Sequence, residues 1–137
     1  MRKKGIFLAV IFVISLACVS VSARASEYLF NYAASIYEGD GSGEITIEFD
    51  VFANMPVDKI GASKITLYRD NGRMVEAITG SVNNGLITKS DHYHYGSHTF
   101  DHLTPGESYY AEVTVFAEDD EGSDSRVIQT RSIRAPY

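Results

Sequence analysis

The sequence predicts an all-β protein, folded as a two-sheet antiparallel β-sandwich of about seven strands. After residue 26, short segments of alternating apolar and polar residues are separated by turn-forming glycine, asparagine and proline, which is typical of a sandwich or a barrel. No stretch in this part repeats apolar residues with the period of a long amphipathic helix. The chain has 137 residues, a length that suits a single domain.

Residues 1–25 are predicted to be a secretory signal peptide, and residues 26–137 to form the sandwich domain. Basic residues at positions 2–4 precede an apolar run over residues 6–21. The small residues of Ala23-Arg24-Ala25 then offer a cleavage site. We therefore expect a secreted, extracellular protein with no stable membrane insertion after cleavage.

Two alternatives for this segment stay open. The apolar run is slightly shorter than the roughly 20 residues of a membrane-spanning helix, and without cleavage it would serve as an anchor. Cys18 offers a site for lipid attachment, although Ser15 stands where lipoproteins have a leucine.

The mature chain is strongly acidic. Cleavage after residue 25 removes four basic residues and no acidic one, which changes the formal net charge from −6 to about −10. Such a surface repels phosphate backbones and anionic membranes, so nucleic acid is excluded as a partner, while cations remain candidate ligands. Cys18 is the only cysteine. A mature domain without disulfides fits secretion by an organism that does not rely on oxidative folding, and we expect a Gram-positive bacterium.

The first two predicted strands cover residues 28–37 and 44–53, with a glycine-rich break at residues 38–43. The second strand is the clearest, because apolar and polar side chains alternate along it. Its predicted inner face carries Ile45, Ile47, Phe49 and Val51, and its outer face Thr46, Glu48 and Asp50. Asn54-Met55-Pro56 is predicted to end this strand.

Further strands follow along the chain. Residues 64–69 and 74–78 are predicted to form a hairpin about Asn71-Gly72, because Asn-Gly supplies the positive φ angles of a tight turn. Residues 79–91 are predicted to be an irregular crossing with a short strand near residues 85–88. The last strands are predicted at residues 93–100, 109–116 and 125–133.

The segment from residue 103 to residue 115 resembles a known family. Leu103, Pro105, Gly106, Tyr109, Ala111, Val113 and Val115 resemble the E–F corner and F strand of fibronectin type III domains, which are immunoglobulin-like β-sandwiches. The resemblance implies structural roles for Pro105 and Gly106 in the turn, and for Tyr109, whose hydroxyl would bond back to a carbonyl of the corner. The family's core tryptophan is missing, since the chain has no Trp, and Phe49 is expected to fill its place.

A second resemblance is to short secreted proteins of Gram-positive anaerobes that have no assigned function. It rests on residues 58–63, on Tyr109-Tyr110-Ala111 and on Asp124-Ser125-Arg126. It implies secretion and fold, and no activity.

The four histidines of the chain lie within eleven residues of one another. His92 and His94 are two apart, so on a strand they point from the same face. Such a pair can supply two zinc ligands, which His98, Asp91 or Asp101 would complete. The alternative is an edge strand with its histidines in solvent and with Tyr93 and Tyr95 turned inward.

Two other groups of residues are candidate binding sites. The loop at residues 118–124 has five carboxylates in seven residues, which suits calcium, although the EF-hand spacing is absent and an exposed loop kept soluble by charge is the alternative. Tyr93 and Tyr95 could form an aromatic platform for a sugar ring or for a protein partner.

The sequence lacks the usual constellations of a hydrolase. There is no Gly-x-Ser-x-Gly elbow, and no cysteine remains in the mature chain. Glu48 and Asp50 are paired on the outer face of their strand without an apolar pocket to separate their pKa values. We expect these two carboxylates to form surface ion pairs, and the protein not to be an enzyme.

The sequence therefore predicts a secreted, monomeric binding module for an extracellular protein or glycan, without catalysis and without a required cofactor. The alternative is a zinc-binding protein built on His92, His94 and His98. A third hypothesis is self-assembly through an exposed edge strand.

Overall fold

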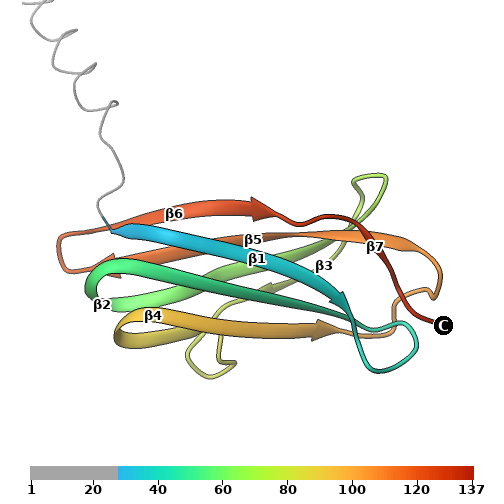
Figure 1. The fold of residues 1–137 in the computed structure, drawn as a ribbon, viewed down its shortest axis with the longest axis horizontal. Helices are drawn as coiled ribbons and strands as arrows, with labels where there is room; N and C mark the ends of the chain where they lie inside the picture. Colours follow the sequence, from blue (N-terminus) through green and yellow to red (C-terminus); the bar gives the residue numbers. More distant parts are fainter. Residues whose placement is uncertain (1–27) are drawn as a thin grey trace, which may run out of the picture.

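A computed structural model describes residues 28–137 of the chain. The predicted signal peptide, residues 1–25, lies outside the described residues. The described part contains strands and no helix; within it, nothing helical is long and apolar enough to cross a membrane. The strands are β1 (Leu29–Glu38), β2 (Ile45–Arg69), β3 (Met74–Thr79), β4 (Ile87–Phe100), β5 (Ser108–Asp119), β6 (Gly122–Gln129) and β7 (Ile133–Arg134), as Figure 1 shows. The prediction of an all-β fold with about seven strands is confirmed.

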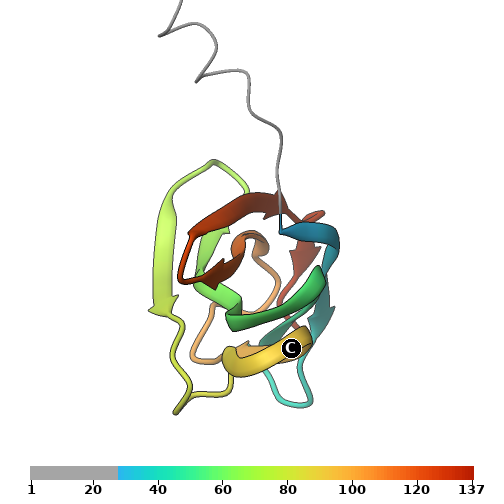
Figure 2. The same ribbon diagram turned by 90° about the vertical axis from the view of Figure 1, so that its left-hand side faces the viewer.

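All seven strands belong to one antiparallel sheet, in which β2 is the central element. The first half of β2 pairs with β1 on one edge and with β4 on the other. Its second half pairs with β3, with β5 and with the start of β4, and β5 pairs further with β6 and β7. In Figure 1, β2 and β4 both turn back at one end of the molecule, and Figure 2 shows that the sheet consequently curls round its interior.

The single curled sheet differs from the two separate sheets that the sequence predicts, and residues 54–56 explain the difference. β2 runs through Asn54-Met55-Pro56, which was expected to end it. The pairing with β4 shifts register between Phe52 and Val57, and Pro56 lies exposed inside this bulge, where its missing N–H costs no ladder hydrogen bond. The bulge bends β2 without ending it, so that the two halves of this one strand pair with different groups of strands.

The core lies inside the curl and is supplied mainly by β2 and β5. Ile45, Ile47 and Val51 have no exposed surface, and Phe49 is 2% exposed, as the alternating pattern predicts. From β5 come Tyr109, Ala111, Val113, Val115 and Ala117, all buried. Full burial of one large aliphatic or aromatic side chain stabilises the fold by about 1.5–3 kcal/mol.

The region predicted to be an irregular crossing is more ordered than expected, because β4 already begins at Ile87. Gly61 lets the start of β4 approach β2. Its φ angle is +152°, and a Cβ on it would lie 2.0 Å from the carbonyl oxygen of Leu86, so glycine is required here. The N–H of Ala62 donates to the same oxygen at 2.8 Å, and Leu86 itself is buried.

Candidate functional site

The side chains of β4 alternate between two faces of the curled sheet. Gly96 and Phe100 are buried, while Tyr93 and Tyr95 are exposed by 37% and 49%. The period of two places His94 and His98 on the same side as Gly96 and Phe100. The two tyrosines therefore point outward, and their alternative inward placement is wrong.

The structure does not bring the three predicted zinc ligands together. The Nε2 atom of His94 lies 2.7 Å from the carbonyl oxygen of Gly85. The ring of His98 packs edge-on against Phe100, with 4.6 Å between centroids, and partial burial lowers the pKa of His98. His92 is exposed beside Asp91.

The metal hypothesis therefore gains no support from the geometry. Among residues 28–137, no group of three or more His, Cys, Asp or Glu side chains is arranged to hold a metal ion. His94 and His98 are four residues apart on an extended strand, which separates them by about 13 Å. That distance is too long for two ligands of one zinc ion.

The acidic segment at residues 118–124 is not the loop that we expected, because β5 runs to Asp119 and β6 begins at Gly122. Two of its carboxylates hold Tyr28, just before β1, in place. The hydroxyl of Tyr28 donates to Asp119 at 2.9 Å, and the backbone N–H of Tyr28 donates to Asp124 at 2.5 Å. A hydrogen bond with Asp120 and the charge of the same residue raise the pKa of Asp58. These carboxylates thus interact with protein groups and with each other, and they form no group that could hold a metal ion within the described chain.

The corner between β4 and β5 is built round Tyr109. Its hydroxyl accepts a hydrogen bond from the backbone N–H of Thr104 at 3.0 Å; an amide of the turn, rather than the carbonyl that we expected, is its partner. Pro105 is exposed in the turn. Gly106 has a φ angle of +82°, and its N–H donates to the carbonyl oxygen of Ala135 at 2.8 Å.

The outer face formed by β1, the first half of β2 and β4 carries a set of aromatic and acidic side chains, which we call the tyrosine face. The strand register places Asp50 between Ala33 of β1 and Tyr95 of β4. It likewise places Glu48 between Ser35 and Ser97. The alternation of β2 therefore brings two carboxylates to the middle of a three-stranded surface.

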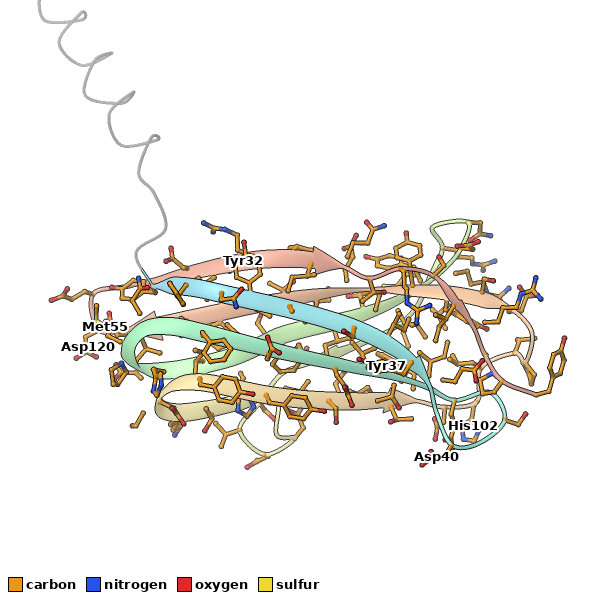
Figure 3. All side chains as sticks on the ribbon, in the orientation of Figure 1. Tyr32, Tyr37, Asp40, Met55, His102 and Asp120 are labelled. Carbon is orange, nitrogen blue, oxygen red and sulfur yellow. The ribbon has the colours of Figure 1, made fainter. Side chains whose placement is uncertain are left out.

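Two tyrosines stand on either side of these carboxylates. Tyr37 comes from β1 and is 45% exposed; Figure 3 shows it near the end of β1 and beside β2. Tyr95 comes from β4. Hydrogen bonding to Glu48 is the first cause of the raised pKa of Tyr95, followed by desolvation and by the negative charge of Glu48. The phenol of Tyr95 is thus held beside a carboxylate.

A surface hollow of about 110 Å³ lies between the two tyrosines, which form part of its lining with Glu48 and Asp50. Ala33 and Ser35 are small enough to leave this space open above β1. Tyr93 lies next to the hollow, and its ring packs on the ring of Phe52 with 4.4 Å between the centroids. The tyrosine face therefore combines an open slot with a flanking aromatic pair.

The two carboxylates of the tyrosine face do not form the ion pairs that we expected from the sequence. No Lys or Arg nitrogen lies within 4.0 Å of Glu48 or Asp50 in the part of the chain that the structure describes. Sequence reasoning also missed Tyr37 as a site residue. The alternation along residues 44–53 put Glu48 and Asp50 on one face, but nothing in the sequence placed residues 33–37 beside them.

Two larger hollows lack this combination of groups. One of about 300 Å³ lies between the β2–β3 turn and the start of β5, and its lining is polar, with Arg69, Asp70 and Arg134. The other, of about 320 Å³, lies between β1 and the end of β6, with Tyr37 as its only aromatic residue. Neither offers two aromatic rings on either side of carboxylates.

Comparison with known proteins gives structural matches only: no family model and no curated protein matches the chain. A family 76 glycoside hydrolase from a bovine Bacteroides thetaiotaomicron strain matches with a TM-score of 0.43 and 13% identity over 77% of this chain and 20% of that chain. The putative ApaA protein from Bordetella pertussis matches with a TM-score of 0.44 and 7% identity over 82% and 98%. A Northeast Structural Genomics Consortium target matches with a TM-score of 0.41 and 13% identity over 83% and 89%.

The match to the hydrolase corrects one expectation. We therefore withdraw the expectation that the protein is not an enzyme, since a glycoside hydrolase is among the solved structures that match this chain. The chain spans only about one fifth of that hydrolase. At this TM-score and identity, the match carries no activity over to the present protein.

Proposed function

We propose that the protein is a secreted binding module that takes an extracellular glycan on the tyrosine face. The observation that carries this proposal is the hollow between Tyr37 and Tyr95, with Glu48 and Asp50 in its lining. A sugar ring presents an apolar face of C–H groups and an edge of hydroxyls. Aromatic rings match the first, and carboxylate oxygens accept hydrogen bonds from the second.

The strand positions of these residues favour binding without rearrangement. Tyr37, Glu48, Asp50 and Tyr95 all lie on paired strands rather than on loops. Groups on strands are held more precisely than groups on loops, which lowers the entropy that binding costs. A glycan is favoured over a protein partner because the slot is small and its lining combines rings with carboxylates, whereas the core of a protein interface is depleted of charge.

We propose that the curled sheet is a variant of the fibronectin type III-like sandwich. The first half of β2 pairs with β1 and β4, while the second half pairs with β3 and β5, and β5 with β6. Two such groups of strands would correspond to the two layers of a sandwich joined by one bent strand. The hydrogen bond between Tyr109 and Thr104 supports the same interpretation.

The experiment that tests the function is a glycan array probed with the purified chain, followed by calorimetry on the glycans that bind. Tyr95→Ala should weaken binding by about thirtyfold, since truncation of a central aromatic residue at a binding site costs about 2 kcal/mol. The matched control is Tyr110→Ala, which removes a half-buried tyrosine from β5. The proposal fails if the array shows no ligand, or if both variants bind as the parent does.

A further inference from the structure

The hollow between Tyr37 and Tyr95 continues into a second one along the tyrosine face. The second hollow has a volume of about 250 Å³ and shares Tyr37 and Glu48 with the first. It extends over the end of β1 to the turn before β2, where Asp40 lies at the end of the molecule (Figure 3). The two hollows together form a groove, which we call the acidic groove.

The charge of the acidic groove has one sign only. Five carboxylate residues line it, and neither a lysine nor an arginine does: the five are Glu38, Asp40, Glu44, Glu48 and Asp50. Lysine and arginine nitrogens also lie more than 4.0 Å from all five carboxylates within residues 28–137. The groove is therefore a negatively charged surface without direct ion pairs, and it is bounded by aromatic rings.

Only part of this charge is engaged by hydrogen bonds. The carboxylate of Glu44 accepts the N–H of Gly41 at 3.0 Å. The phenol of Tyr95 lies beside Glu48, which raises the pKa of Tyr95. Asp50 has no hydrogen bond or ion pair with another residue of the described chain, so its oxygens are available to a ligand.

We infer that the glycan bound on this face is a polymer of amino sugars that carry protonated amines, recognised by the acidic groove. This inference rests on the proposed function. A protonated amine gains charge-assisted hydrogen bonds to Glu48 and Asp50 and an attraction to the faces of Tyr37 and Tyr95. An anionic glycan is repelled by the same charges. A neutral one gains the stacking and the hydrogen bonds of its hydroxyls to the carboxylates, without the attraction between opposite charges.

The length of the groove favours a polymer over a single sugar. Its carboxylates on β2 and on the preceding turn extend from Asp50 to Glu44, six residues apart along the chain. At about 3.3 Å per residue of extended chain, this corresponds to about 20 Å, more than one sugar ring occupies. Successive amines of one polymer can therefore meet successive carboxylates.

The two tyrosines favour a glycan over a basic peptide. A lysine ammonium group would contact the carboxylates and the rings as the amine of a sugar does. Its linear alkyl chain, however, covers less of the exposed rings of Tyr37 and Tyr95 than the C–H face of a sugar ring does. Sugar rings satisfy both kinds of group. A lysine peptide therefore serves as a competitor that distinguishes charge attraction from recognition of the sugar.

The test compares two hexasaccharides that differ in whether their amines are free or acetylated, and therefore in charge. Calorimetry measures the binding of the β-1,4-linked hexamer of glucosamine and of its N-acetylated counterpart, at a mildly acidic pH and low salt. The amine form should bind about fivefold more tightly, because an exposed ion pair contributes up to about 1 kcal/mol. Raising the salt concentration should reduce this preference, since exposed charges are screened.

Variants distinguish the failure of this inference from the failure of the proposed function. Glu48→Gln combined with Asp50→Asn should reduce the preference for the amine, because it removes two of the five carboxylates of the groove. Glu121→Gln, a change of an exposed carboxylate in the β5–β6 turn, should leave the preference intact. Tyr95→Ala should weaken both hexasaccharides.

Each contrary result has a distinct meaning. Equal affinity for the two hexasaccharides, with a loss on Tyr95→Ala, overturns the inference and leaves glycan binding standing. Absence of any glycan ligand overturns both. Tighter binding of hexalysine that is indifferent to Tyr95→Ala also overturns the inference, because it identifies a peptide as the ligand.

Discussion

Two outer faces of the same sheet each carry tyrosines beside a glutamate, but the tyrosines of the two faces make different contacts. On the tyrosine face, Tyr37 and Tyr95 stand apart across an open hollow. On the face of β5 and the second half of β2, the rings of Tyr68 and Tyr110 stack on each other, with 5.2 Å between centroids and an interplanar angle of 16°. The hydroxyl of Tyr68 donates to Glu112 at 3.4 Å.

Strand register is the reason for the difference. Tyr68 and Tyr110 are directly opposite each other in the β2–β5 pairing, so that their rings stack on each other. Tyr37 and Tyr95 lie on β1 and β4, which are separated by β2. The tyrosines of the β5 face therefore stabilise the fold, whereas those of the tyrosine face remain available to a ligand.

The largest effect should come from closing the hollow. Ala33→Tyr places a large side chain where Ala33 now leaves space, and it should weaken glycan binding by about thirtyfold, or about 2 kcal/mol. Stability should change by no more than about 0.5 kcal/mol, because Ala33 is exposed. Ala77→Tyr, on exposed β3, is the matched control in the same calorimetric assay. Unchanged binding by Ala33→Tyr would place the ligand elsewhere.

Removal of one tyrosine from each face should lower the free energy of unfolding by different amounts. Tyr110→Ala loses the stack on Tyr68 and should lower the free energy of unfolding by about 1–2 kcal/mol. Tyr95→Ala should lower it by less than about 0.5 kcal/mol, because its ring is half exposed. Urea denaturation measures both values, and equal losses would contradict the distinction between the faces.

A substitution at the corner between β4 and β5 should lower the stability of the fold and leave glycan binding on the tyrosine face unchanged. Tyr109→Phe removes the hydroxyl that accepts the N–H of Thr104 and should cost about 1 kcal/mol of stability. Glycan affinity should stay within twofold of the parent at a temperature where the variant is folded. A selective loss of binding would show that the corner also shapes the tyrosine face.

The smallest effect concerns alkaline titration. The pKa values of Tyr95 and Tyr68 are both raised, for Tyr95 chiefly by its hydrogen bond to Glu48 and for Tyr68 chiefly by desolvation. Glu48→Gln should therefore return the pKa of Tyr95 toward its ordinary value more fully than Glu112→Gln does for Tyr68. Because a raised pKa means that the folded state holds the proton more tightly, this contribution to stability is present below about pH 10 and is lost as the pH rises further.

These shifts are measured by NMR titration of each tyrosine in the parent and in the two glutamine variants. Equal downward shifts in both variants would contradict the assignment of different causes. An unchanged pKa of Tyr95 in Glu48→Gln would show that the carboxylate is not its partner in solution.

The alternation of side chains fixed much of the fold in advance. The buried set Ile45, Ile47, Phe49 and Val51 follows directly from a period of two along residues 44–53. The same period placed Glu48 and Asp50 on the opposite face. It could not place the histidines correctly, because it does not say which face of β4 is turned toward the interior.

The site could be predicted only in part. Tyr93 and Tyr95 were recognised as candidates from the sequence, but Tyr37 was not, since its position near Tyr95 depends on two strand registers. The ion pairs expected for Glu48 and Asp50 are missing because no basic residue is brought near them. Such proximity is a long-range property that local pattern does not contain.

By itself, the sequence determined that this protein is all-β, which residues of its clearest strand are buried, and where most of its turns fall, because these follow from local periodicity and turn chemistry. Only the tertiary structure decided that β2 continues through Pro56 and curls the sheet, and that the face of β1, β2 and β4 holds an open slot between two tyrosines. The physical reason is that a bulge and a strand register depend on contacts between residues far apart in the chain, which are settled when the core packs.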